Sequence, residues 1–518
     1  MLRSISIWVI LIATNAICQT TYVLDQNQAL ALVNDDGIFF QNTASNAPGY
    51  EIPAESGNHT TYGMSFWMTS IDDTGLIYSS CQAFSGNTDL FTGPISDDYS
   101  NPWYLETYDT AIWKVTRDEI EYHMSNFTAI GYSPSQGIAS WPGNGNSVYG
   151  VAEQLAPYVD LDNNSLYEPL LGDYPFILGD QALYVILNDD REIHSTTGGA
   201  SFGVELHCMF YQFEATGDLD STTFLNVKVI NRSDRTYDDF AFGLFADFDL
   251  GHFSDDYIGS DSANNLFFVY NCHDVDPGGN GQPGYGANSP AFGTMFLNKQ
   301  SNSVMANAPG TPSPPGLTGF YEFMRATWPG AGHLLFGGNG YDLDTTSIET
   351  NYLYSGNPNL PGSWSEASLL NISSDRRGIM SAKEEPLNAG DNICYDIAFI
   401  YSRDGSNNLE NAENLVNVAI DIQEFYETDI QPCDAIFSQS SFPYDPIFSV
   451  FPNPSSGNFS IWADQPGLAI LTDLNGKMVL CSSIVIGKND FEKDFASGIY
   501  LLRITTSGEA FTTRLVIR

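Results

Sequence analysis

Basic residues are scarce in this chain, in which 19 Lys and Arg stand against 63 Asp and Glu, for a formal net charge of −44 at pH 7. A chain this acidic repels the phosphates of nucleic acid and of anionic lipids, so nucleic acid is excluded as a partner. Carboxylates in such excess either repel one another at the surface or are neutralised by divalent cations. Because 13% of the residues are aromatic, we expect the chain to fold and not to be disordered.

Long apolar runs are also missing, except at the N-terminus. Arg3, the apolar residues 5–13 and the cleavage region 16–18 fit an export signal. The apolar run is too short for a permanent membrane helix, so we predict a signal peptide over residues 1–18 and no transmembrane segment in the mature chain. A lipid anchor on Cys18 is the less favoured alternative, because the bulky Ile17 stands where a lipobox needs a small residue.

The chain contains no Cys-x-x-Cys. Removal of the signal leaves six cysteines, namely Cys81, Cys208, Cys272, Cys394, Cys433 and Cys481. An exported protein with an even number of cysteines can form up to three disulfides. The first candidate pair is Cys394, on a strand-like run, with Cys433, just past a helical one. The alternative is that several of the six are small buried hydrophobic residues.

Motifs typical of catalytic sites are absent: there is no Gly-x-Ser-x-Gly, no His-Glu-x-x-His and no phosphate-binding loop. The seven histidines are scattered, and structural roles are favoured over a transition-metal site for His194 with His207 or Cys272 with His273. A glycosidase carboxylate pair is defined by distance in space and not by spacing in sequence, so a hydrolase stays open as the alternative.

What the chain does contain is a β-rich pattern. Runs such as residues 203–213, 224–230 and 392–401 alternate with period two, which predicts strands with at least one buried face. Residues 271–319 are rich in Gly, Pro and Asn and are expected to form a long excursion held by few hydrophobic contacts. We predict a mainly β protein, with a β-sandwich-type passenger over residues 19–435, in one domain or subdivided near residue 150, and a linker over 436–447.

Two helices are expected within this passenger. Residues 112–124 carry Thr116 and Glu119 at capping-box spacing. Residues 409–427 have an apolar face that includes Leu415 and Ile420, and Asn407 or Asn408 precedes them as a cap.

The densest group of carboxylates lies between residues 247 and 261 and consists of Asp247, Asp249, Asp255, Asp256 and Asp261. Carboxylates this close in sequence repel one another unless a hard cation lies between them, and calcium takes six to eight oxygen ligands from flexible loops. We therefore expect bound calcium here, and the alternative is a solvated acidic loop.

A second candidate comprises Asp160, Asp162 and Asn164, which match positions one, three and five of a calcium loop. Ser165 and Leu171 depart from the EF-hand pattern, so a looser calcium site and a plain Asx-rich turn both remain open. A third candidate is the Asp-x-Asp pair Asp274 and Asp276. Because Pro and Gly follow this pair, a turn is favoured here over a metal site.

The pattern of the last residues predicts a separate small β-domain, because short apolar runs alternate with Gly, Pro, Asn and Asp. Their order of motifs resembles the type A C-terminal sorting domain of the type IX secretion system of Bacteroidetes, over residues 448–518. The residues that carry the resemblance are Pro452, Asn453, Pro454, Gly457, Asn475, Gly476, Gly498 and Tyr500. The resemblance implies that the type IX machinery is a partner and that the protein passes through the periplasm to be secreted or held at the outer cell surface.

Residues 30–427 resemble a family of long exported Bacteroidetes proteins that end in the same tail, although the resemblance implies no activity. Its landmarks include Phe66-Trp-Met68, Trp113-Lys-Val115, Asp247-Phe-Asp249 and Ser374-Asp-Arg-Arg377. Because the sequence contains none of the catalytic motifs considered above, it favours a non-catalytic protein. We expect a calcium-stabilised surface or secreted protein for adhesion or for binding glycan, surface polysaccharide or matrix. A secreted hydrolase of polysaccharide or protein is the alternative.

Overall fold

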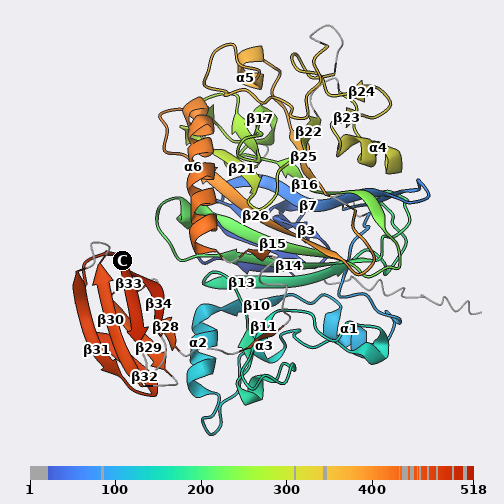
Figure 1. Cartoon of the computed structure of the whole chain (residues 1–518). Helices are drawn as coiled ribbons and strands as arrows, with labels where there is room; N and C mark the ends of the chain where they lie inside the picture. Colours follow the sequence, from blue (N-terminus) through green and yellow to red (C-terminus); the bar gives the residue numbers. More distant parts are fainter. Residues whose placement is uncertain are drawn as a thin grey trace, which may run out of the picture. The chain divides into compact units, whose positions relative to one another are not determined.

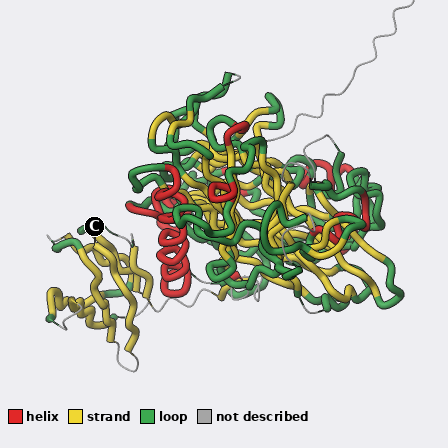
Figure 2. The backbone as a smooth tube through the Cα atoms, turned by 90° about the horizontal axis from the view of Figure 1, so that it is seen from above, coloured by secondary structure: helices red, strands yellow, loops and turns green. Residues whose placement is uncertain are grey.

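A computed structural model describes residues 21–82, 87–279, 281–307, 311–341, 347–384, 386–430, 432–433, 441–443 and 448–451, and residues 453–517 apart from 454, 456, 464–465, 474–476, 493–494 and 506–509. It divides the chain into two compact units, Met1–Asp160 with Asn164–Phe442, and Leu161–Asn163 with Pro443–Arg518. Strand is the dominant element of both (Figures 1 and 2). The predicted mainly β fold is confirmed. The predicted signal peptide and most of the predicted linker lie outside the described residues.

Two nine-stranded antiparallel sheets form the first unit, and we call them sheet 1 and sheet 2. Sheet 1 has the order β1 (Thr21–Leu24), β2 (Leu30–Asn34), β3 (Ile38–Phe39), β7 (His59–Asp72), β16 (Tyr237–Phe248), β25 (Arg376–Lys383), β22 (Ser303–Asn307), with β6 (Tyr50–Glu51) and β8 (Ile77–Cys81) attached. Sheet 2 has the order β10 (Trp113–Thr116), β13 (Gln181–Asn188), β14 (Val204–Gln212), β15 (Thr223–Asn231), β26 (Asn392–Ser402), β21 (Ala291–Phe296), β18 (Leu266–Asn271), β17 (Asp256–Asp261), with β9 (Phe91–Thr92) attached.

The largest hydrophobic core lies between the two sheets. It contains Phe66 and Phe242 from sheet 1 and Phe210 and Tyr395 from sheet 2, and the ring of Phe242 stacks on that of Tyr395 at 4.3 Å. A second core covers the other face of sheet 2, where α6 (Asn408–Asp429) packs on β18, β21 and β26 (Figure 1). Sheet 2 is therefore buried on both faces, which explains why every residue of β13 and β14 is buried.

The remaining short elements lie in the connections of the first unit. The helices are α1 (Pro102–Tyr108), α2 (Arg117–Asn126), α3 (Gln136–Ala139), α4 (Gly316–Phe323) and α5 (Glu366–Leu369), with 3-10 turns at Ser147–Tyr149, Pro169–Leu171, Gly217–Ser221 and Phe253–Asp255. The short strands are β4 (Gln41–Asn42), β5 (Ala47–Pro48), β11 (Tyr158–Asp160), β12 (Tyr174–Pro175), β19 (Val275–Asp276), β20 (Gly286–Ala287), β23 (Thr327–Trp328), β24 (Gly332–His333) and β27 (Ser441–Pro443). None of the described helices is long and apolar enough to cross a membrane.

Both expected helices form, with corrected bounds. The capping box of Thr116 and Glu119 is present, but it starts α2 at Arg117, and the residues before it form strand β10. Asn407 caps α6 by accepting hydrogen bonds from the amides of Leu409 and Glu410. Ile420, expected on the buried face of α6, is 49% exposed.

Residues 271–319 are not a loose excursion throughout. Strand β21 is buried along its whole length in sheet 2, and β22 forms an edge of sheet 1. The expectation failed because these strands are short and stand between stretches rich in Gly and Pro, so their flanks dominate the local pattern.

A disulfide joins Cys394 on β26 to Cys433 just past α6, which confirms the first candidate pair. Cys81 and Cys208 are buried free thiols, Cys272 is half-buried and Cys481 is exposed. The bridge therefore holds the end of α6 against the sheet that this helix covers.

Replacing both Cys394 and Cys433 by alanine is expected to lower the free energy of unfolding by about 3 kcal/mol. The bridge closes a chain segment of 39 residues, and its loss restores that segment's freedom in the unfolded state. Urea unfolding of the two proteins measures the difference. Cys481→Ala is the control and should change it by less than about 0.5 kcal/mol. A double variant as stable as wild type would contradict the expectation.

The second unit is a small sandwich with its own core. A three-stranded sheet has the order β28 (Phe448–Phe451), β29 (Asn458–Ala463), β32 (Gly487–Glu492), and a four-stranded sheet has the order β31 (Met478–Ile484), β30 (Gly467–Asp473), β33 (Gly498–Thr505), β34 (Ala510–Ile517). Phe459, Ile461, Leu471 and Leu502 are buried between them.

Candidate functional site

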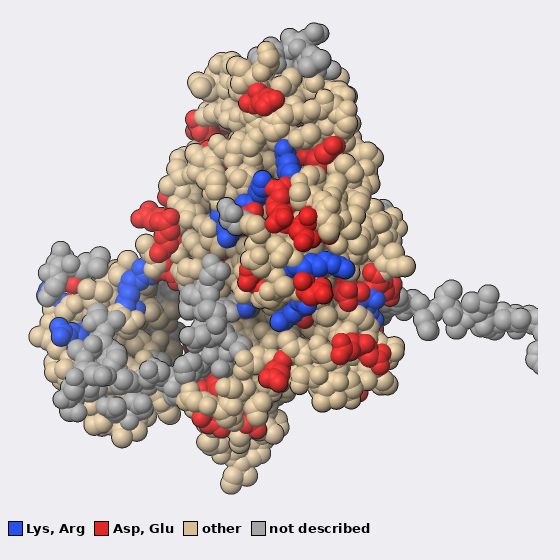
Figure 3. Space-filling model, turned by 45° about the vertical axis from the view of Figure 1, so that its right-hand side comes forward, with Lys and Arg blue, Asp and Glu red and all other residues tan. Residues whose placement is uncertain are grey.

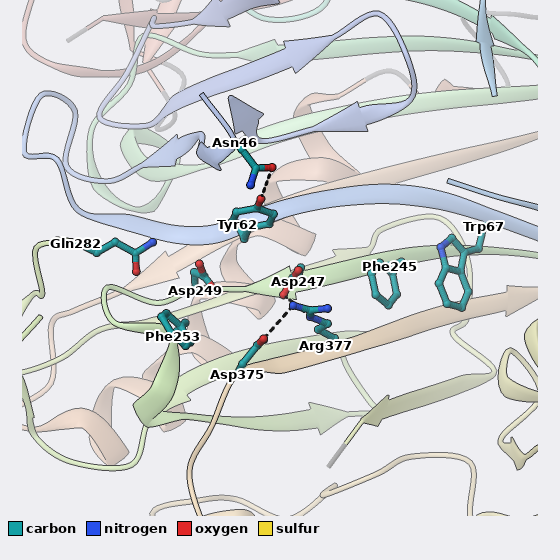
Figure 4. A pocket seen from close by; sticks show the side chains of 10 residues that line it. All are labelled: Asn46, Tyr62, Trp67, Phe245, Asp247, Asp249, Phe253, Gln282, Asp375 and Arg377. Atoms are coloured by element: carbon teal, nitrogen blue, oxygen red, sulfur yellow. Dashed lines mark hydrogen bonds and ion pairs between the residues drawn. The ribbon is translucent and has the colours of Figure 1, made fainter. Parts of the chain in front are cut away.

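The outer face of sheet 1 carries an open pocket of about 600 Å³ (Figure 4). Its lining consists of Asn46, Tyr62, Trp67, Phe245, Asp247, Asp249, Phe253, Gln282, Asp375 and Arg377. Most of these residues come from the neighbouring strands β7, β16 and β25 or from the residues just beyond their ends. The pocket is therefore built on a rigid sheet surface.

The polar part of the pocket follows from strand alternation. On β16, Ala246 and Phe248 point into the core, so Phe245, Asp247 and Asp249 face the opposite side. The antiparallel register places Asp247 directly opposite Arg377 on β25, and Asp375 lies two residues before Arg377 on the same side. Two chain segments about 130 residues apart thus supply one site.

Three carboxylates converge in the pocket. Asp247, Asp249 and Asp375 each offer an oxygen, and these three atoms lie within 4.8 Å of one another. Arg377 lies between two of them, because its Nε donates to Asp247 Oδ1 at 3.0 Å and its Nη2 donates to Asp375 Oδ2 at 2.9 Å (Figure 4). When all four groups are ionised, the cluster has a net charge of −2, which one divalent cation would neutralise.

Two of the three carboxylates, Asp247 and Asp249, have a raised pKa. Burial raises the pKa of Asp249 to about 7, and the charge of Asp375 adds to this rise. Burial also raises the pKa of Asp247 well above its ordinary value, against the opposing effect of Arg377. Groups that are this costly to ionise are typical of functional sites that hold a cation or move a proton.

Aromatic side chains form the apolar part of the pocket. Trp67 is buried. Its ring stacks on that of Phe245, with the ring centres 4.5 Å apart, and the ring of Phe320 in α4 meets it edge-on at 4.7 Å. Phe245, Tyr62 and Phe253 are half-buried and so keep surface open to the pocket. The hydroxyl of Tyr62 donates to Asn46 Oδ1 at 2.7 Å, which orients its ring.

The structure separates the five aspartates that are clustered in sequence. Asp247 and Asp249 line the pocket, whereas Asp255 and Asp256 lie beyond the Gly251 turn, where Asp256 is fully buried. Asp261 ends β17, and its carboxylate accepts hydrogen bonds from the amides of the following turn.

The second predicted group forms a turn at the end of β11. The carboxylate of Asp160 accepts hydrogen bonds from the amides of Asn164 at 3.2 Å and Ser165 at 2.7 Å. The side-chain oxygen of Asn164 accepts from Leu166, and Asp162 is exposed. Only the bond from Leu166 to Asn164 has the geometry of an Asx turn, and the looser calcium site stays a prediction.

The sequence did not identify Asp375, Arg377 or the aromatic lining residues as parts of a site. These aromatic residues are Tyr62, Trp67, Phe245 and Phe253. Asp375 and Arg377 did stand out, within Ser374-Asp-Arg-Arg377, as a landmark of the family resemblance. An acidic and a basic residue two positions apart at the start of a strand share one face, which is the signal that could have revealed them.

Within the second unit, the side chain of Asn453 forms two hydrogen bonds with the backbone of β34. Its side chain donates to the carbonyl of Arg514 at 2.6 Å and accepts from the amide of Val516 at 2.8 Å. Gly457 and Gly498 adopt positive φ, and the hydroxyl of the buried Tyr500 donates to Ala496. The other predicted sorting residues, Pro452, Pro454, Asn475 and Gly476, lie outside the described residues.

Comparison with protein families identifies the tail. Residues 449–518 match the model of the secretion system C-terminal sorting domain. The chain is therefore a substrate of the type IX secretion system, with this machinery as a partner, and it is exported to the cell surface or the medium.

None of the curated proteins matches the chain. Among solved structures a polysaccharide lyase is 7% identical over a match that covers 70% of this chain and 38% of the lyase, with a TM-score of 0.20. A likeness this weak carries no argument about the fold or the function.

Proposed function

We propose that the exported passenger is a non-catalytic, calcium-dependent glycan-binding protein, used at the cell surface or in the medium for adhesion to polysaccharide or matrix. The observation that carries the proposal is the convergence of Asp247, Asp249 and Asp375 beside a half-buried aromatic surface in one open pocket.

Calcium suits the carboxylates better than a transition metal does. The cluster offers only hard oxygen ligands, which calcium and magnesium prefer, and magnesium demands a stricter octahedral geometry. Three protein oxygens leave further coordination positions open to water or to the hydroxyls of a ligand. Arg377, whose side chain is 49% exposed, can turn toward solvent when a cation replaces it.

The ligand that fits the rest of the pocket is a neutral sugar chain. Phe245, Tyr62 and Phe253 offer apolar ring surface against which a sugar face can pack, and the nearby amides of Asn46 and Gln282 can bond to hydroxyls. The acidic side chains are scattered over the surface in view in Figure 3 and not gathered in one patch. With a chain charge of −44, an anionic polysaccharide would be repelled unless calcium bridged it.

Asp375→Asn is expected to abolish calcium-dependent glycan binding while leaving the fold intact, because the amide keeps the shape of the carboxylate and removes its charge. Binding to a panel of neutral polysaccharides is measured in calcium and in chelator, together with the melting temperature. In wild type, calcium at a hundred times its dissociation constant adds about 2.7 kcal/mol of stability per site. The matched control is Asp73→Asn, in an exposed turn. Equal calcium-dependent binding by wild type and Asp375→Asn would refute the proposal.

A glycoside hydrolase is the second candidate, and one observation favours it. Burial raises the pKa of Asp249 to about 7, so this carboxyl is partly protonated at neutral pH beside Asp375. An acid and a second carboxylate this close are nearer to the arrangement of retaining glycosidases than to that of inverting ones. Release of reducing sugar from the same panel by wild type, and its loss in Asp249→Asn, would establish the hydrolase in place of the binding protein.

A further inference from the structure

We propose that the first unit has a second cation site, apart from the pocket lining, in which Asp255, Asp256, Asn271 and Asp276 hold a calcium ion. The inference does not rest on the proposed function, because none of these four residues lines the pocket. The ligand class follows from the donors, which are carboxylate and amide oxygens.

Strand pairing and backbone bonds bring the four residues together. Asp256, the first residue of β17, is directly opposite Asn271, the last residue of β18. The amide of Cys272, next to Asn271, donates to the carbonyl of Asp255 at 2.7 Å. Such a cross-strand pair has its side chains about 5 Å apart, within reach of a shared ion.

Asp276 reaches the same place from β19. Its carboxylate accepts hydrogen bonds from the amides of Gly278 at 3.1 Å and Tyr285 at 2.8 Å. Gly251 and Gly284 leave room for it, because a Cβ at these glycines would lie 1.8 and 2.4 Å from its oxygens. The backbone is thus shaped around this carboxylate, whose charge acts on both Asp255 and Asp256.

Buried polar atoms without partners are the independent sign of a ligand. Asp256 and Asn271 have no exposed surface, yet Asp256 Oδ1 and both side-chain polar atoms of Asn271 have no hydrogen-bond partner, and Asp255 Oδ1 has none either. Leaving such atoms unpaired lowers the stability of the folded protein. Native proteins rarely tolerate this, so a group of them around one point indicates an ion or a bound molecule.

The charge of the group favours an ion over a neutral molecule. Asp255, Asp256 and Asp276 bring three carboxylates together, and among the described residues no Lys or Arg forms an ion pair with any of them. A divalent cation would neutralise most of this charge and satisfy the unpaired oxygens at once. The competing explanation is a protonated Asp256 that donates a hydrogen bond to the side-chain oxygen of Asn271, which would be independent of metal.

The site would also stabilise the loop that leads to the pocket. Asp256 Oδ2 accepts a hydrogen bond from the amide of Leu250, the residue after Asp249. A cation held by Asp256 would therefore fix the segment between β16 and β17, and with it the position of Asp249.

The test is calcium titration of the purified, chelator-treated full exported protein by calorimetry, with bound calcium counted by equilibrium dialysis. Asp256→Asn is expected to lose one bound calcium per chain and to melt at a temperature that calcium raises less than in wild type. In chelator the variant should be at least as stable as wild type, because the substitution relieves carboxylate repulsion. The same amount of bound calcium in Asp256→Asn and in wild type would overturn the proposal.

Two further variants separate the explanations. Asp375→Asn should keep the ion at Asp256, so loss of the pocket ion and loss of the buried ion are distinguishable. Asn271→Asp adds a ligand charge, and calcium should then raise the melting temperature more than in wild type. If Asp256 is instead protonated and no ion binds, Asn271→Asp changes the melting temperature equally with and without calcium, which would also overturn the proposal.

Discussion

Deleting residues 448–518 is expected to leave the passenger in the periplasm and to remove it from the cell surface and the medium. The tail matches the secretion system C-terminal sorting domain over residues 449–518, and it carries the address that the type IX machinery recognises. Without it the predicted N-terminal signal would still direct the protein across the inner membrane. Fractionation of the native host, followed by immunoblotting of periplasm, surface and medium, measures the effect.

Misfolding of the truncated passenger would be a trivial cause of retention, and the structure argues against it. Both passenger cores consist of residues up to Cys433, and the core of the tail is built from its own residues alone. The melting temperature of the truncated protein from the periplasm should therefore equal that of the passenger in the full chain. The converse control fuses residues 448–518 to a periplasmic reporter, which should then leave the cell. Normal levels of truncated passenger outside the cell would contradict the sorting role.

Features that depend on near neighbours in sequence could be predicted. The capping box at Thr116 and Glu119, the cap at Asn407, the alternating strands and the order of motifs in the tail are all local signals, and each is confirmed. The Cys394–Cys433 bridge joins the ends of two consecutive elements, β26 and α6, which pack on each other in the structure. Elements adjacent in sequence are usually adjacent in space.

The pocket depends on strand pairings that sequence does not show. Strand β16 pairs on one side with β7, about 165–190 residues earlier, and on the other side with β25, about 130–140 residues later. Only this order brings Asp375 and Trp67 beside Asp247. Conversely, the run from Asp247 to Asp261 looks like one cluster in sequence, but the turn at Gly251 sends its two halves to different places. Spacing in a loop says little about distance when a left-handed turn intervenes.

Replacing Arg376 by methionine is expected to lower the free energy of unfolding by about 3–5 kcal/mol, because it leaves a buried carboxylate without its counter-charge. Arg376 and Glu366 form a fully buried pair in which Nε donates to Oε1 at 3.0 Å and Nη2 donates to Oε2 at 2.7 Å. Glu366 Oε1 also accepts from the amide of Ile258, so the pair joins α5, β17 and β25. Urea unfolding of wild type and variant measures the loss.

Arg377→Met is the matched control, because this arginine is half exposed and burial already raises the pKa of its partner Asp247, which can take up a proton when the arginine is removed, so its loss should cost less than that of Arg376. The two variants also separate the effect on stability from the effect on binding, because the two arginines are neighbours at the start of β25, next to Asp375. Arg377→Met should alter cation and glycan binding with the fold intact, whereas Arg376→Met should weaken the fold first. Glu366→Gln combined with Arg376→Met should recover part of the lost stability, since the amide keeps an acceptor for Ile258 and removes the unpaired charge. Equal stability of wild type and Arg376→Met would show that the buried pair does not hold this strand in place.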